Sequence, residues 1–236
     1  MTNRILLCTY EGEAYLEAQL ASMEGQTESN FRLLLSDDAS TDRSFAIGEA
    51  AAARDERITA IRRESGSGSA ARHFLEGLRD PHFFSAADES DYYLFSDQDD
   101  IWHPDKLAVE ARAMRCLEAR YGKALPLLVH CDMRVVDGAG REIAPSYVRY
   151  QKMSPARRQL RQLLVQNNVT GGAMLMNHAL VRLLVAHPVP EHAVMHDHWI
   201  ALVAAAFGRI AYLDRALYDY RQHGDNVLGA KKGGAL

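Results

Sequence analysis

Short apolar runs alternate with helical patterns along the first half of the chain. Continuous hydrophobic runs predict buried strands at residues 5–9, 31–35, 57–61 and 92–95. Apolar residues at helical spacing predict helices after them, at residues 16–23, 42–54, 70–78 and 104–121. Apolar strands separated by helices indicate a mostly parallel sheet covered on both faces, so we expect an α/β fold.

The second half has a more mixed pattern. One strand is predicted at residues 127–131, and VVDGAGREI predicts a hairpin that turns at Asp137–Gly138. Helical spacing then predicts three helices, at residues 155–165, 178–185 and 197–207. Two late strands are predicted at 209–213 and 217–220. We therefore expect a small antiparallel or mixed part to follow the parallel sheet.

Polar side chains gather where the predicted strands end. The first strand ends in Thr9–Tyr10–Glu11, the second in Asp37–Asp38 and the fourth in the segment SDQDD. Ligands of open α/β sheets bind beyond the carboxyl ends of the strands, so we expect these residues to line one crevice. An Asp-x-Asp pair there can direct two carboxylates at a hard cation, Mg²⁺ or Mn²⁺.

Acidic residues also cap helices and end turns, and this is the preferred interpretation of Asp42 and Asp105. It explains Asp97–Gln98–Asp99–Asp100 poorly, because three aspartates within four residues repel one another unless a cation compensates their charge.

Composition narrows the class of protein. The 236 residues are 47% hydrophobic and 25% charged, which is typical of a globular chain and excludes a disordered one. A net charge of -4 argues against a nucleic-acid partner. Three cysteines within apolar runs are expected to be core residues rather than a disulfide framework. The N-terminus lacks a secretory pattern and the longest apolar stretch, at 200–207, cannot span a membrane, so we expect a cytoplasmic protein.

Six sequence blocks resemble inverting glycosyltransferase family 2, whose members have the GT-A nucleotide-sugar fold. The blocks are LLCTYEGEAYLEAQLASMEGQT, LLLSDDASTD, YLFSDQDDIWHPDKL, NNVTGGAMLMN, HDHWIALVAAAFGRI and YRQHGDNVLGA, in this order. FSDQDDIW together with NNVTGG, HDHW and QHGDN is similar to the rhamnosyltransferase branch, which uses dTDP-L-rhamnose to build cell-surface polysaccharides. The resemblance implies one domain over residues 1–236, with a nucleotide-binding half at 1–125 and an acceptor and catalytic half at 126–236.

The resemblance implies a nucleotide site on the first two strand ends. Thr9, Tyr10 and Glu11 match the loop that lies against the base and ribose. Asp38 matches the residue that accepts a hydrogen bond from the pyrimidine N3–H, and Asp37 is expected to shape that pocket. Relatives usually carry asparagine at the position of Glu11.

The resemblance also implies the catalytic and metal residues. Asp97 corresponds to the ribose side of the Asp-x-Asp motif and Asp99 to the metal ligand. Asp197 in HDHW matches the general base that takes the proton of the acceptor hydroxyl, and His223 matches a late ligand of the metal or diphosphate. Such a displacement needs no covalent nucleophile, and no G-x-S-x-G motif is present.

A glycine loop is implied beside the donor sugar. Gly171 and Gly172 match the loop where the backbone approaches that sugar. Trp199 is grouped with them as a candidate for acceptor stacking, although packing is the favoured interpretation of both Trp102 and Trp199. His192 and His196 have a spacing that could bind zinc on a helix, but the H-E-x-x-H pattern is absent and a supporting role is favoured.

The predicted function is therefore metal-dependent sugar transfer from a dTDP- or UDP-sugar to a saccharide or lipid-linked saccharide. No membrane span is expected, and peripheral association with the inner face of the cell membrane stays open. One alternative is a sugar-nucleotide nucleotidyltransferase, but TYEGEAYLEAQ lacks the glycine-rich basic loop that cradles a triphosphate. Another is a nucleotide-sugar-binding module without turnover.

Overall fold

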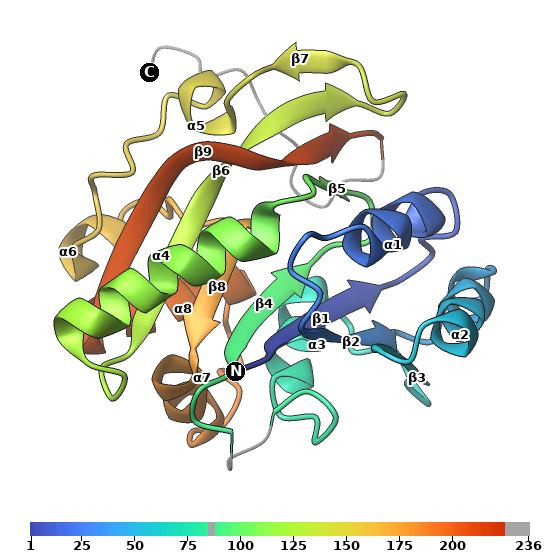
Figure 1. Ribbon diagram of the computed structural model, residues 1–236, viewed down its shortest axis with the longest axis horizontal. Helices are drawn as coiled ribbons and strands as arrows, with labels where there is room; N and C mark the ends of the chain where they lie inside the picture. Colours follow the sequence, from blue (N-terminus) through green and yellow to red (C-terminus); the bar gives the residue numbers. More distant parts are fainter. Residues whose placement is uncertain (85–87, 225–236) are drawn as a thin grey trace.

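A single mixed sheet forms the centre of the molecule (Figure 1). The computed structural model describes residues 1–84 and 88–224. Within them, nine strands form the sheet in the order β3-β2-β1-β4-β8-β6-β9-β5, with β7 beside β6. The strands are β1 (Asn3–Thr9), β2 (Phe31–Asp37), β3 (Ile58–Arg62), β4 (Tyr92–Ser96), β5 (Ile101–Trp102), β6 (Leu127–Asp137), β7 (Glu142–Ala144), β8 (Met174–Asn177) and β9 (Arg209–Gln222).

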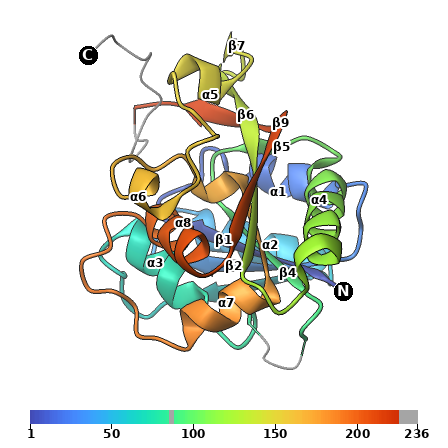
Figure 2. The same cartoon turned by 90° about the vertical axis from the view of Figure 1, so that its left-hand side faces the viewer.

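Helices cover both faces of this sheet (Figure 2). They are α1 (Leu16–Glu24), α2 (Ser44–Arg54), α3 (Ala70–Gly77), α4 (Lys106–Tyr121), α5 (Tyr147–Tyr150), α6 (Leu160–Leu163), α7 (His178–Val185) and α8 (His196–Phe207). Ile5 and Leu7 pack with α1, α2 and α4 on one face, whereas Leu6 and Cys8 pack with α3, α7 and α8 on the other. Strands buried on both faces explain the continuous apolar runs, and the predicted α/β fold is confirmed.

The parallel half of the sheet brings the predicted polar ends together. β1 pairs in parallel with β2 and β4, and β2 pairs in parallel with β3. In this register Thr9 lies opposite Asp37, and Leu7 lies opposite Ser96. The residues that follow β1, β2 and β4 therefore leave the sheet at the same edge.

The second half differs from the predicted elements in two places. The two expected late strands are one strand, β9, which pairs in parallel with β6 along its length. The register shifts so that Cys131 and Asp132 face Leu213 and Ala216, which leaves the intervening polar residues 214–215 as a bulge. These polar residues interrupt the apolar pattern, and this interruption suggested a gap between strands.

The predicted helix over 155–165 shortens to Leu160–Leu163. The cause is Asn168, whose Nδ2 donates to the carbonyls of Ser154 and Arg157 and so holds the preceding segment in turns. The hairpin after β6 forms as expected, with the N–H of Asp137 donating to the carbonyl of Arg141.

Three smaller expectations have mixed outcomes. Asp42 precedes Arg43, the N-cap of α2, and accepts from the N–H of Ser44, so it forms a turn before the helix without being its cap. Asp105 occupies the N-cap position of α4 but makes no capping hydrogen bond. Cys8 and Cys131 are buried, whereas Cys116 is exposed, so the expectation of three core cysteines is wrong for Cys116. No helix in the described residues is long and apolar enough to cross a membrane.

Candidate active site

A cavity of about 1030 Å³ lies beyond the carboxyl ends of β1, β2 and β4 and is closed by segments of the second half. It collects most of the candidate residues: Thr9, Tyr10, Glu11, Asp38, Asp97, Asp99, Gly171, Asp197 and His223. Asp37, Gly172 and Trp199 do not line it. The cavity thus joins carboxylates from both halves of the chain.

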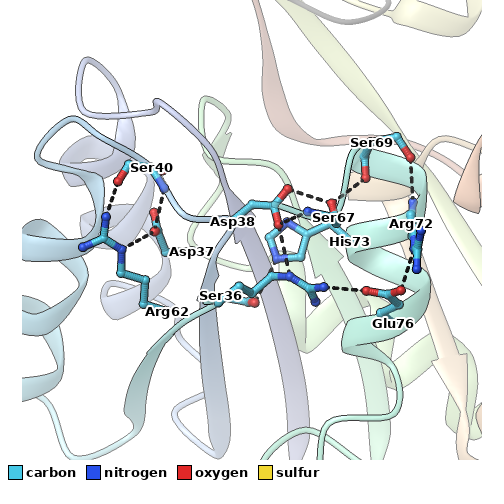
Figure 3. A network of polar contacts seen from close by, with 11 residues as sticks. Ser36, Asp37, Asp38, Ser40, Arg62, Ser67, Ser69, Arg72, His73 and Glu76 are labelled. Carbon is cyan, nitrogen blue, oxygen red and sulfur yellow. Dashed lines mark hydrogen bonds and ion pairs between the residues drawn. The ribbon is translucent and has the colours of Figure 1, made fainter. Parts of the chain in front are cut away.

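Asp38 lies at one end of the cavity and is held by the loop that follows β3 (Figure 3). Its Oδ1 accepts from the N–H of Ser67 (2.8 Å) and its Oδ2 from the Ser67 hydroxyl (2.7 Å). Arg63 Nε lies 3.1 Å from Oδ1, and Arg63 also pairs with Glu76 at 2.6 Å. A ligand N–H that reaches Asp38 must therefore share its oxygens with Ser67 or displace that hydroxyl.

Asp37 and Glu11 shape the backbone around this end. Asp37 is fully buried, and its Oδ2 accepts from the N–H of Ser40 at 3.0 Å (Figure 3). Glu11 has a φ of 49°, in the left-handed region, and its Oε1 accepts from the N–H and hydroxyl of Thr41. Asparagine adopts this backbone conformation more readily than glutamate, so the conformation suits the asparagine that the resemblance leads us to expect at this position.

Gln98, the middle residue of Asp-x-Asp, links the acidic loop after β4 to the loop after β1 through hydrogen bonds. Its Oε1 accepts from the Thr9 hydroxyl (2.7 Å) and the Tyr10 N–H (2.8 Å), and its Nε2 donates to the Tyr10 carbonyl (3.1 Å). A Cβ at Gly12 would collide with this side chain. Sequence reasoning missed Gln98 because it counted the residue as a spacer.

Carboxylates crowd the acidic loop, where Asp97 and Asp99 line the cavity and Asp100 lies outside its lining. Burial, followed by the charges of Asp99 and Asp197, raises the pKa of Asp97 to about 7. Burial, followed by the charges of Asp99 and Asp97, raises the pKa of Asp100 well above its ordinary value. Such shifts mark a place where negative charge lacks compensation. A bound cation would supply that compensation.

His223 brings a second ligand type to the acidic loop. It follows β9 directly, and its Nε2 lies 2.7 Å from Asp99 Oδ2. The His223 ring also packs against Tyr15 in a tilted arrangement, with centroids 4.7 Å apart. Arg221 Nε donates to the Asp99 carbonyl, which fixes the loop against β9. Asp99 and His223 are thus positioned together.

A hard divalent cation fits this pair. No group of three or more His, Cys, Asp or Glu side chains is arranged to hold a metal within residues 1–84 and 88–224. Mg²⁺ and Mn²⁺ sites in nucleotide enzymes need only one or two protein ligands, because phosphate oxygens and water complete the shell. The same finding gives no support to the zinc alternative for His192 and His196.

Asp197 lines the same cavity from the first turn of α8, near enough to Asp97 for its charge to act on that carboxyl. Met195 is the N-cap, so Asp197 is not the capping residue of this helix. Asn167 Nδ2 donates to Asp197 Oδ1 at 3.0 Å, and the N–H groups of Gly171 and His198 also stabilise the carboxylate. Burial nevertheless raises its pKa to about 6.

His196 is a cavity residue to which the sequence assigned only a supporting role. Its ring stacks on Phe74 with centroids 4.2 Å apart, and neither ring nitrogen has a hydrogen-bond partner in the described part of the chain. Burial lowers its pKa to about 3, so the imidazole is neutral. A Cβ at Gly171 would collide with His196 Nε2, which explains the glycine. The signal available in the sequence was its position beside Asp197.

Two of the remaining candidates have packing roles. Trp199 contacts the apolar cluster of α3, α7 and α8, and Trp102 is 2% exposed. Gly172 lies behind the acidic loop, where a Cβ would come within 3.2 Å of Asp100 Oδ2. The last residues of the QHGDN block, from 225 onward, lie outside the described residues.

The curled α/β sheet with an acidic cavity at its strand ends is the GT-A fold of a glycosyltransferase. The chain belongs to glycosyl transferase family 2, whose family model matches residues 4–182.

Two curated relatives extend this likeness. The dTDP-rhamnosyl transferase RfbG of Shigella flexneri is 33% identical over 112 residues, covering 47% of this chain and 36% of the relative. A glycosyltransferase of Nostoc sp. is 26% identical over 231 residues, covering 94% of this chain and 65% of the relative. The matched region is therefore less than two thirds of the length of either relative.

Solved structures share the fold at low identity. TarS of S. aureus, crystallised with UDP, has a TM-score of 0.65 at 20% identity, and the match covers 94% of this chain and 61% of TarS 1-349. The mannosyltransferase PcManGT of Pyrobaculum calidifontis, in complex with GDP-Man and Mn²⁺, has a TM-score of 0.63 at 18% identity. The match covers 92% of this chain and 56% of PcManGT.

Proposed function

We propose that this glycosyltransferase is an inverting, divalent-metal-dependent enzyme that transfers L-rhamnose from dTDP-L-rhamnose, or a related sugar from a dTDP- or UDP-sugar, to a saccharide acceptor. The observation that carries the proposal is one cavity holding Asp38, the Asp99–His223 pair and Asp197. The rhamnosyl donor rests on the similarity to RfbG of Shigella flexneri.

In this proposal the first half of the chain, residues 1–125, holds the nucleotide. Asp38 accepts from the base N3–H, the loop from Thr9 to Glu11 lies against the base and ribose, and Asp97 binds the ribose. Gln98 supports this assignment because it joins the first loop to the acidic loop through three hydrogen bonds.

Asp99 and His223 would hold Mg²⁺ or Mn²⁺ at the diphosphate. When bound, such an ion neutralises the charge that grows on the departing diphosphate. The raised pKa values of Asp97 and Asp100 support a cation there, because buried carboxylates avoid ionisation when none is present.

Asp197, in the acceptor half at 126–236, would accept the proton of the attacking hydroxyl. Its hydrogen bonds to Asn167 and to two backbone N–H groups fix the carboxylate at the cavity wall. An in-line attack from this side inverts the anomeric centre without a covalent intermediate, and the transition state has oxocarbenium character. His196 lines the cavity as a neutral imidazole, and its ring is proposed to form the wall beside the donor sugar.

A panel of sugar nucleotides tests this assignment. Thermal shift with dTDP-rhamnose, UDP-sugars and GDP-sugars, with and without Mg²⁺ or Mn²⁺, identifies the donor, because a ligand at 100 times Kd stabilises the fold by about 2.7 kcal/mol. Donor hydrolysis and product formation, followed by mass spectrometry, distinguish turnover from mere binding. Binding without any turnover, with every acceptor and metal tried, would favour the binding-module alternative.

The base site should discriminate between pyrimidines. UDP and dTDP carry an N3–H for Asp38, whereas neutral cytosine does not, so CDP should bind at least about tenfold more weakly. Isothermal titration calorimetry of the three diphosphates measures the difference. Asp38→Ala should remove the discrimination, and Glu64→Gln, which changes an exposed carboxylate near the same loop, should retain it. Equal affinities in the unaltered protein would exclude this role of Asp38.

A further inference from the structure

One stretch of the chain has a charge opposite to the rest. Residues 143–190 contain no aspartate or glutamate, yet they hold six basic residues: Arg149, Lys152, Arg157, Arg158, Arg161 and Arg182. The whole chain has a net charge of -4. Positive charge is therefore concentrated on the segments that connect β7 with α7.

The centre of this stretch exposes apolar side chains among its arginines. Leu164 is 63% exposed and Val165 is 87% exposed, whereas the preceding residue, Leu163, is buried with an exposure of 1%. We define the 157–165 surface by its exposed members: Arg157, Arg158, Leu160, Arg161, Leu164 and Val165. None of its three arginines forms an ion pair within residues 1–84 and 88–224.

This surface adjoins the acceptor side of the cavity. His198 Nε2 donates to the Leu163 carbonyl at 2.8 Å, and Asn167 Nδ2 donates to Asp197 at 3.0 Å. Helix α4, which also carries exposed arginines, lies on the other side of the molecule (Figure 2). Anything that binds to residues 157–165 would therefore lie close to the cavity wall that contains Asp197.

We propose that the 157–165 surface docks onto an anionic lipid bilayer. Leu160, Leu164 and Val165 enter the interfacial region, and the three arginines contact lipid phosphates. Buried apolar area and attraction to anionic lipids together determine the strength of such interfacial binding. The net charge of the chain is negative, so an anionic membrane repels the molecule as a whole. The arginines of the 157–165 surface must therefore provide the attraction.

Vesicle sedimentation of the full chain tests the proposal without nucleotide or acceptor. The protein should sediment with phosphatidylglycerol–phosphatidylcholine vesicles, remain in solution with pure phosphatidylcholine, and be released by high salt because screening shortens the range of attraction. Arg157→Gln/Arg158→Gln/Arg161→Gln should lower partitioning at least about tenfold. Leu164→Ser/Val165→Ser should also lower it, without changing the charge.

The matched control removes the same charge from α4: Arg112→Gln/Arg115→Gln/Arg120→Gln should bind vesicles like the unaltered protein. Arg158 donates to the Ile210 carbonyl, so Arg157→Gln/Arg161→Gln provides the test if the triple variant is unstable.

No sedimentation of the unaltered protein, or equal loss in the α4 control, would overturn the proposal. Self-association that depends on Leu164 and Val165, without vesicle binding, would instead assign the surface to a second copy. Because the readout is lipid binding, failure here leaves the proposed sugar transfer separately testable.

Discussion

Asp197→Asn is expected to lower sugar transfer by about 10²–10⁴-fold, the usual contribution of a general base. Asparagine keeps the size of the side chain but cannot take the acceptor proton. Nucleotide affinity should change far less than the rate of transfer, because the base and diphosphate are assigned to Asp38 and the Asp99–His223 pair, which lie outside α8. Initial rates of transfer, together with calorimetry of dTDP binding, measure the two effects on one sample.

Asp214→Asn is the matched control, because Asp214 is exposed and pairs with Arg149 away from the cavity. Met195, not Asp197, is the N-cap of α8, so loss of capping cannot explain a fall in activity. Near-normal transfer by Asp197→Asn would exclude this residue as the base.

The pH profile should report the same carboxylate. Since burial raises the pKa of Asp197 to about 6, kcat/KM should fall as pH decreases through 6, where the base becomes protonated. The effect of pH on stability runs in the opposite direction. The raised pKa means that the folded protein favours the neutral form of Asp197, so the contribution of this residue to the free energy of unfolding is lost as pH rises from about 4 to about 6. As pH rises across this window, the Tm of Asp197→Asn should therefore increase relative to the Tm of the unaltered protein.

Melting curves of both proteins, without nucleotide, at several pH values between 4 and 7.5 check this difference. A constant difference in Tm at every pH would show that Asp197 does not titrate in this range, and would remove the basis for the expected pH profile.

Asp99→Ala is expected to abolish measurable transfer, with a loss of more than about 10²-fold, because the proposed metal site would lose its carboxylate ligand. The affinity for dTDP should fall to its metal-free value and no longer respond to Mg²⁺ or Mn²⁺. Calorimetry with and without the ion measures this response directly. Asp97→Ala should be milder, since Asp97 is assigned to the ribose, and Asp214→Ala, which removes an exposed carboxylate outside the cavity, serves as the control.

Removing one of several crowded carboxylates should leave the fold intact, so a lost response cannot be blamed on unfolding. Circular dichroism and Tm verify this point. Metal-dependent binding that persists undiminished in Asp99→Ala would place the ion elsewhere and refute its assignment to Asp99.

Much of the fold was predictable from the sequence because its strands are buried on both faces. Continuous apolar runs located β1, β2 and β4, and the polar residues after them marked the cavity edge. The prediction was weaker after residue 126, where β9 carries the polar bulge at 214–215 and Asn168 prevents a longer helix before α6. Both features depend on distant partners that a local pattern does not contain.

The candidate site shows the same limit. Motif spacing found Asp38, Asp99 and Asp197, but it could not reveal that Ser67 already bonds both oxygens of Asp38. Nor could it show that Gln98 ties the acidic loop to Thr9 and Tyr10. These contacts join residues about thirty to ninety positions apart, so they arise from the register of the parallel strands and not from local propensity.

Strand β9 lies between β6 and β5, and it delivers His223 to a carboxylate that was synthesised 124 residues earlier. Because N-terminal parts of a protein generally fold first during synthesis, the parallel half can form while β9 is still missing. A nascent chain at that stage contains Asp38 and Asp99 but lacks His223, the residue proposed to complete the diphosphate end of the site. Products that lack β9 should therefore fail to transfer sugar even where the parallel half of the sheet has folded.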